Sequence, residues 1–464
     1  MSELTADTWT SRYREALDLD VIRQRATVRG TALHGLDALP IEVACSLLRD
    51  GLKAVFLPTE RCCTLIRREV ERALAHAAKV YQDPREVLRA GYSGFMSVEP
   101  YMPTLITGPA GSGKTQLRLA IGRVLNGRRE VWIDESHPRV PLIDYVECAV
   151  GNQKSVSGVL RPLAGPEIAA GRVKIKAPEL PGQCARWQRL CGACLLGADE
   201  MQFMTQSANA TVLITSTMLA IAELQLPWFA IANYSLGWKL SSRPAEATQR
   251  LLGNPTLMLP DPPDSADWSA LLTEYELVAG GLFSFKLTEQ TIGLWNLSAG
   301  LKRELVKLLV HSYRLARRGG ATQTTWEHVK LAFGSVEFSV PRRDINLLIA
   351  HAAQGGDLRK DLECPFSGTE INEQKQAYEE KLRQARAAKV ADEVIRSAMT
   401  GSEKQAIVDI ENRAVQAVPS KTGEALKVKR GGKRTLESLL DAGRRARSRR
   451  SASAPGAVGD EPSA

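Results

Sequence analysis

The sequence predicts an α/β fold: a mostly parallel sheet between helices, followed by a small helical lid and a basic, partly disordered C-terminal tail. Short apolar runs alternate with amphipathic stretches from residue 104 onward, which is the pattern of strand–helix–strand units. Three prolines between Pro260 and Pro263 end that alternation, and helical spacing follows. The positive charge is concentrated after residue 420. These observations separate an α/β core from a helical domain and a tail.

The apolar runs give the expected strands, and the amphipathic stretches give the expected helices. The strands are 104–107, 140–148, 193–198 and 228–232, with helices 115–125, 155–163 and 210–224 between them. A helix at 60–80 precedes them, and helices at 268–277, 288–297, 301–317 and 325–332 follow. We therefore expect an N-terminal helical leader at 1–52, the α/β core at 53–262, the helical lid at 263–340 and a charged extension at 341–464.

Composition favours a cytoplasmic protein. The eight cysteines are scattered through segments expected to be buried, which is typical of reduced thiols. The first residues lack the basic start and apolar stretch of a secretory signal. The most apolar long window, 210–233, is interrupted by Glu223 and Pro227. A buried helix and strand explain this window better than a membrane span.

Nearly all of the net charge lies in the tail. The chain carries +9, and residues 421–450 alone hold eleven Lys and Arg against three acids. Such a segment either binds DNA phosphates or is a solvated end. Within it, Thr435–Leu440 places apolar residues at helical spacing, which suits a short helix that docks in a partner's groove.

A phosphate-binding loop is the strongest motif. Residues 108–115 read Gly108, Pro109, Ala110, Gly111, Ser112, Gly113, Lys114, Thr115, directly after an apolar strand and before an amphipathic helix. The glycines let successive N–H groups point at a phosphate, helped by the helix N-terminus. Lys114 is expected to neutralise phosphate oxygens, and Thr115 to offer its hydroxyl to Mg²⁺. The loop therefore predicts binding of ATP with Mg²⁺.

Hydrolysis needs an acid pair after a buried strand, and the chain offers two candidates. Asp199 and Glu200 follow the apolar run at 193–198, one strand–helix unit after the loop, where the neighbouring strand is expected. Asp134 and Glu135 come only about twenty residues after Lys114, on what reads as a hairpin. We favour Asp199 as the metal-side acid and Glu200 as the residue that polarises the attacking water.

Further polar residues are candidates for the same site. Asn233 ends an apolar strand and could position water at the γ-phosphate, or simply terminate the strand. Charge on the transferred phosphoryl group needs a cation, often from a neighbouring subunit. Arg250 is our candidate and Arg243 its competitor; either could be a solvated surface arginine. Arg303, with Lys302, opens a helix in the helical lid and could contact the nucleotide.

Three cysteines have a spacing that resembles a metal site. Cys184, Cys191 and Cys194 are close in sequence, and His137 would be needed as a fourth ligand. Because Cys191 and Cys194 flank the entry into a predicted strand, three ordinary thiols are the better interpretation.

In this order the features resemble the AAA+ family, and within it the target-selection ATPases of heteromeric DNA transposons, the TnsC and TniB type. The resemblance spans about residues 53–335 and includes Phe56-Leu57-Pro58-Thr59, the phosphate loop, 195–200, 230–233, 249–251 and 298–301. It implies that Thr59 lies near the adenine and that Arg250 acts in the neighbour's site. The sequence departs from the family in the stretches 128–139 and 165–189, which lengthen the spacing between the two ATPase motifs. Either stretch could hold DNA-contacting residues such as Arg172, Lys174 and Lys176.

The resemblance also implies a function. The ATP-bound protein would form a ring or helical filament on double-stranded DNA and, together with a target-selector protein, recruit transposase. ATP hydrolysis would then release it from the DNA. Two alternatives remain open: a helicase loader or initiator-type AAA+ protein, and a P-loop signalling switch that never touches DNA.

Overall fold

A computed structural model describes residues 6–81, 100–125, 128–131, 135, 140–150, 155–201, 210–403 and 406. These residues belong to one compact unit, Met1–Ile407. The basic tail, Asp134 and His137 lie outside the described residues. Among the described residues, no helix combines the length and apolar character that crossing a bilayer requires.

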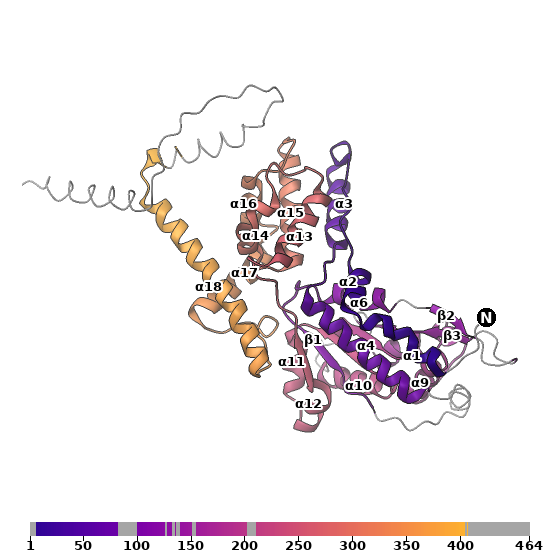
Figure 1. The fold of residues 1–464 in the computed structure, drawn as a ribbon. Helices are drawn as coiled ribbons and strands as arrows, with labels where there is room; N and C mark the ends of the chain where they lie inside the picture. The colour runs from indigo at the N-terminus through magenta and orange to yellow at the C-terminus, as the bar shows by residue number, and fades with distance from the viewer. Residues whose placement is uncertain are drawn as a thin grey trace, which may run out of the picture. The chain divides into compact units, whose positions relative to one another are not determined.

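The core is a five-stranded parallel sheet (Figure 1). Its strand order is β4-β5-β6-β1-β7. A separate antiparallel pair joins β2 to β3. The strands are β1 (Thr104–Thr107), β2 (Arg128–Val131), β3 (Val140–Ile143), β4 (Val146–Ala149), β5 (Leu196–Asp199), β6 (Trp228–Ala232) and β7 (Asn254–Leu257).

Helices cover both faces of this sheet. Strand β6 shows why: Phe229 and Ile231 pack into one apolar cluster, and Trp228 and Ala230 into the other. The first face is covered by α1 (Ala6–Arg14), α2 (Leu19–Ala26), α4 (Glu60–Val80) and α6 (Lys114–Val124). The second is covered by α7 (Val156–Leu160), α8 (Pro166–Ala169), α9 (Leu180–Leu190), α10 (Ala210–Ala222), α11 (Tyr234–Ser241) and α12 (Ala245–Leu252).

A third apolar cluster forms the helical domain. It contains α13 (Ala266–Ala279), α14 (Thr291–Ser298), α15 (Lys302–Arg318), α16 (Trp326–Gly334), α17 (Ser339–Gln354) and α18 (Thr369–Ala398). The leader helix α3 (Ile41–Ala54) also packs here, against α13 and α15 (Figure 1). The predicted α/β fold class is confirmed: a parallel sheet lies between helices and is followed by a helical domain.

One predicted strand is wrong. Residues 140–148 do not form one strand, because β3 and β4 belong to different sheets and are separated at Asp144 and Tyr145. Arg12 of the leader explains the break. Its guanidinium is buried and donates to Asp144 Oδ1 at 2.8 Å, while the Tyr13 hydroxyl donates to the Asp144 carbonyl at 3.2 Å. This buried ion pair holds the chain where a continuous strand would have to run straight.

Candidate functional site

A cleft of about 540 Å³ lies where the phosphate loop, the ends of two strands and the helical domain meet. Its lining comes from six separate parts of the chain. The polar lining residues are Lys53, Thr115, Gln116, Lys114, Asp199, Glu200, Asn233, Tyr275, Lys302 and Arg303. The remaining lining residues are glycines and apolar residues: Val55, Phe56, Leu57, Ala110, Gly111, Gly113, Ile231, Leu271 and Val306.

The phosphate loop links β1 to α6 and has the backbone that the sequence predicts. Gly111 and Gly113 have φ of 90° and 101°, in the region that favours glycine. At Gly108 an added Cβ would lie 2.2 Å from the Met258 carbonyl oxygen, so only glycine fits. The Ser112 hydroxyl is buried and forms no hydrogen bond within the described part of the chain. A buried polar atom of this kind fits a loop that binds a polar ligand.

Lys114 is the buried cation of this loop. Its ammonium donates to the carbonyls of Gly108 and Pro109, at 2.9 and 2.8 Å. Burial, together with the charge of the neighbouring Arg303, lowers the pKa of Lys114 to about 7, while Asp199 and Glu200 oppose the shift. An anion placed in the cleft would therefore stabilise the charged form of Lys114.

Asp199 and Glu200 lie at the end of β5 and face the cleft. One oxygen of Asp199 accepts from the Glu200 amide at 2.8 Å, and the other from Arg118 Nε at 3.0 Å. Glu200 has a φ of 64°, a strained value for a residue with a side chain. Strained backbone concentrates at functional sites, so this conformation agrees with the role predicted for Glu200.

Asn233 lies at the end of β6, next to the phosphate-loop strand. It also caps the start of α11, where its side chain makes no capping hydrogen bond. The side chain lines the cleft. The structure therefore brings Asn233 together with Lys114, Asp199 and Glu200, as the sequence predicts.

The helical domain supplies the opposite wall. Arg303, in the first turn of α15, donates its backbone N–H to the Gly111 carbonyl at 3.3 Å. An added Cβ on Gly111 would lie 3.0 Å from Arg303 Cβ. Its neighbour Lys302 pairs with Asp261 at 2.9 Å. Arg303 therefore reaches the phosphate loop, and its contact with a nucleotide stays a prediction.

Apolar side chains also line the cleft. Val55, Phe56 and Leu57 come from the segment before α4, and Leu271 and Val306 from α13 and α15. Such a surface suits an aromatic base. Thr59 is not among the lining residues: it is buried and caps α4, accepting from the Cys62 amide at 3.2 Å. Its predicted place beside the adenine stays a prediction.

The two candidate arginines lie outside the cleft lining. Arg250 is exposed on α12, where it pairs with Glu246 at 3.0 Å. Arg243 is partly buried at the end of α11. The structure does not bring either one to this chain's own Lys114. The predicted role therefore stays that one of these arginines acts on the nucleotide bound by a neighbouring copy of the chain.

The rival acid pair and the cysteine cluster do not join the site. Glu135 is exposed and is not a lining residue of the cleft, and Asp134 falls outside the described residues. Cys184, Cys191 and Cys194 are buried free thiols. Within the described ranges, no three His, Cys, Asp or Glu side chains are grouped so that they could hold a metal ion.

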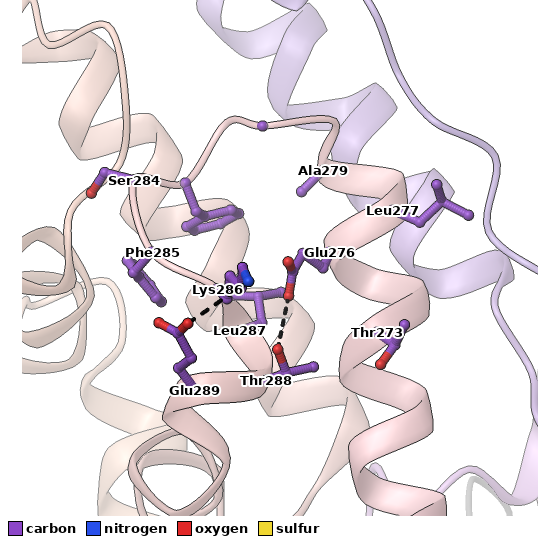
Figure 2. Close-up of a pocket in the computed structure, with 12 residues that line it drawn as sticks. Thr273, Glu276, Leu277, Ala279, Ser284, Phe285, Lys286, Leu287, Thr288 and Glu289 are labelled. Carbon is purple, nitrogen blue, oxygen red and sulfur yellow. Dashed lines mark hydrogen bonds and ion pairs between the residues drawn. The ribbon is translucent and has the colours of Figure 1, made fainter. Parts of the chain in front are cut away.

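Another hollow, of about 780 Å³, lies against α13 in the helical domain (Figure 2). Two pairs of its polar groups interact with each other. Thr288 Oγ1 donates to Glu276 at 3.3 Å, and Lys286 lies 4.0 Å from Glu289 (Figure 2). None of the predicted site residues lines it. The volume of a cavity therefore does not identify the candidate site. The charged groups that converge in the 540 Å³ cleft do.

Sequence reasoning missed Arg118. It lies four residues after Lys114, one turn along α6, and joins Asp199 to Glu147 through ion pairs of 3.0 and 2.6 Å. The helical spacing from Lys114 was the available signal, because residues four apart share one face of a helix.

The residues present fit a nucleotide with Mg²⁺. Mg²⁺ prefers oxygen ligands, and the cleft offers the exposed Thr115 hydroxyl and the Asp199 carboxylate. Both Asp199 oxygens already accept a hydrogen bond, which favours contact through water. Lys114 and Arg303 provide positive charge on the side of the loop.

No protein-family model matches the chain, and a comparison with curated proteins found no match. Solved structures do align with it. The Aeropyrum pernix ORC1 protein in complex with DNA is 18% identical over 66% of this chain and 73% of that chain, with a TM-score of 0.40. The A. pernix ORC2 protein in its ADPNP-ADP complexes is 14% identical over 72% and 92%, with a TM-score of 0.38. The Thermotoga maritima RuvB Holliday junction branch migration motor is 12% identical over 58% and 76%, with a TM-score of 0.30. Scores this low assign no function.

Proposed function

We propose that this chain binds ATP with Mg²⁺ and hydrolyses it as an AAA+ ATPase. One observation carries the proposal. A single cleft gathers the phosphate loop, the acid pair after β5, the polar end of β6 and an arginine of the helical domain. These groups are far apart in sequence and are the ones that phosphoryl transfer requires.

Each group has a distinct role in this proposal. Lys114 and the loop amides hold the phosphates, and Thr115 and Asp199 hold the metal, which neutralises charge on the transferred group. Glu200 orients and polarises the attacking water, and Asn233 holds that water at the end of β6. Arg303 lies against the loop, so its contact with the phosphates would link nucleotide binding to the position of the helical domain.

Self-association would complete the site. Arg250 is exposed and does not line this chain's own cleft, so it would act on the nucleotide of a neighbouring copy in a ring or helical filament. Arg243 is the alternative donor of that charge. Replacing Arg250 with Ala should lower hydrolysis without changing nucleotide affinity. If Arg243→Ala lowers hydrolysis and Arg250→Ala does not, then Arg243 is the arginine that acts on the neighbouring copy.

We further propose that the protein assembles on double-stranded DNA and serves DNA transposition, recruiting transposase at a target chosen with a selector protein. The resemblance to the TnsC and TniB type and the charge of the tail support this role. A turn after α8 adds three exposed cations, Arg172, Lys174 and Lys176. Initiator-type and helicase-loading roles use the same fold and stand as the alternative.

The test is DNA binding by the full chain with and without ATP. We expect binding to duplex DNA only with ATP and Mg²⁺, loss of binding in Lys114→Ala, and stimulation of hydrolysis by DNA. DNA binding that is the same with and without ATP would contradict the proposal. ATP hydrolysis that DNA does not stimulate would favour a signalling switch. Co-purification with transposase supports the transposition role, whereas co-purification with a replicative helicase supports the alternative.

A further inference from the structure

One stretch of the helical domain contacts both the α/β core and the rest of its own domain, next to the cleft. We call residues 359–383 the clamp segment. On the core side, the Trp238 indole of α11 donates to the Glu363 carbonyl at 2.8 Å. Pro365 and Phe366 lie so close to Gly237 that an added Cβ there would come within 2.6 and 2.7 Å of them. Helix α11 begins directly after Asn233, so the clamp segment is anchored beside the cleft.

On the helical-domain side, Tyr378 of α18 makes the decisive contact. Its hydroxyl donates to the Ala299 carbonyl at 2.9 Å, and its ring meets Trp295 edge-on, with centroids 6.2 Å apart. One turn further along α18, Lys381 pairs with Asp264 at 3.0 Å. Asp264 lies in the linker between β7 and α13, so the clamp segment also holds the connection between the two domains.

Ala299 belongs to a strained turn that sets the position of Arg303. Ala299 and Gly300 have φ of 52° and 70°, and an added Cβ on Gly300 would lie 2.5 Å from the Trp295 indole nitrogen. Helix α15 starts two residues later. Its first turn brings the Arg303 amide to the Gly111 carbonyl. A left-handed alanine is costly, so a hydrogen bond to its carbonyl helps to hold this conformation.

We propose that Tyr378 is a positioning residue for Arg303, and that the clamp segment holds the helical domain against the phosphate loop. This inference rests on the proposed nucleotide binding at that loop. Tyr378 touches neither the loop nor the cleft lining, and it acts by fixing the turn at 299–300 from which Arg303 projects. Loosening the clamp segment therefore weakens nucleotide binding from outside the cleft.

The experiment measures the affinity of the full chain for a fluorescent ATP analogue with Mg²⁺. Tyr378→Phe keeps the ring against Trp295 and removes only the hydroxyl. We expect its affinity to fall about three- to tenfold, through faster release, because one hydrogen bond to a strained turn is lost. Phe366→Ala, which loosens the core anchor, should act in the same direction. Gln376→Ala, exposed on the same helix, is the matched control and should bind as wild type does.

A double variant separates positioning from general destabilisation. If Tyr378 acts through Arg303, then Arg303→Ala combined with Tyr378→Phe should bind no more weakly than Arg303→Ala alone. Fully additive losses, or unchanged affinity in Tyr378→Phe while wild type binds, overturn the inference and leave the proposed function standing. If wild type binds the analogue no better than Lys114→Ala does, both fail.

Discussion

The core wall and the helical-domain wall of the cleft hold their charged residues in different ways. On the core wall, Lys114 belongs to the loop-helix unit that follows β1, and Asp199 is the last residue of β5; each of these strands pairs with a strand on both sides. On the helical-domain wall, Arg303 depends on a strained turn and on a tyrosine of the clamp segment. The comparison teaches that the sheet fixes the chemical groups, while the helical domain is positioned by a few replaceable contacts. We therefore expect substitutions on the core wall to reduce nucleotide binding or hydrolysis more than substitutions on the helical-domain wall do.

The largest effect is expected from Lys114→Ala. Removing the buried cation leaves the phosphates without their principal charge-assisted donor, so nucleotide affinity should fall by at least about 100-fold. Titration with the fluorescent ATP analogue measures this. Lys53→Ala is the control, because Lys53 also lines the cleft but is exposed and lies outside the phosphate loop. Equal losses in the two variants would contradict a special role for the loop.

Glu200→Gln should separate binding from hydrolysis on the same wall. The amide keeps the size of the side chain but no longer polarises water, so the hydrolysis rate should fall about 100-fold while the affinity changes little. Steady-state phosphate release and analogue titration give the two numbers. Glu223→Gln, an exposed acid after α10, is the control. A rate close to wild type would point away from Glu200 as the residue that acts on water.

Acid should destabilise the core through His76. Burial lowers the pKa of His76 to about 3 from its usual value near 6.5, with Arg189 adding to the shift. Between these values the unfolded chain binds the extra proton, so stability falls as the pH falls below 6.5. From pH 7 to pH 5 the loss is about 2 kcal/mol.

His76→Gln should lose this pH dependence, measured as the change in urea midpoint between pH 7 and pH 5. His34→Gln is the control, since His34 is exposed. In the helical domain, burial also lowers the pKa of His311, but the carboxylate of Glu337 opposes the shift. The Glu337 carboxylate therefore reduces the acid sensitivity that burial gives to His311. An unchanged midpoint shift in His76→Gln would show that another group carries the dependence.

The smallest effect is expected on the helical-domain wall. Arg303→Ala should weaken nucleotide binding about tenfold, because its charge is half exposed and Lys114 remains in place. Lys307→Ala, one turn along α15 and paired with the same Glu304, is the matched control. If Arg303→Ala matches the loss in Lys114→Ala, then the two walls contribute equally and the comparison fails.

Much of the site could be predicted because its determinants are local. The glycines and lysine of the phosphate loop specify a backbone turn within eight residues, and the structure has that turn. Strand β6 was predicted to the residue, since five consecutive apolar side chains are buried on both faces of the sheet. Asp199, Glu200 and Asn233 were chosen because each comes at the end of an apolar run. The expectation that the strand of the acid pair neighbours the phosphate-loop strand was wrong, because β6 lies between β5 and β1.

Other features depended on contacts between distant residues. The break between β3 and β4 comes from Arg12, which lies far from Asp144 in sequence. Arg118 was missed because a lone arginine on an amphipathic helix resembles a solvated one until Asp199 and Glu147 are placed beside it. Helix α3 was assigned from chain order to the N-terminal leader, but it packs in the helical domain.

The sequence by itself determined the phosphate loop, the α/β alternation and the acids that follow its strands, because short-range backbone geometry and burial encode them. Only the tertiary structure decided which polar groups share the cleft and that Arg303 lies against Gly111. It also decided that Tyr378, 75 residues further along the chain, holds the turn before Arg303. Such long-range contacts depend on how separately folding elements pack, and no local pattern records that packing.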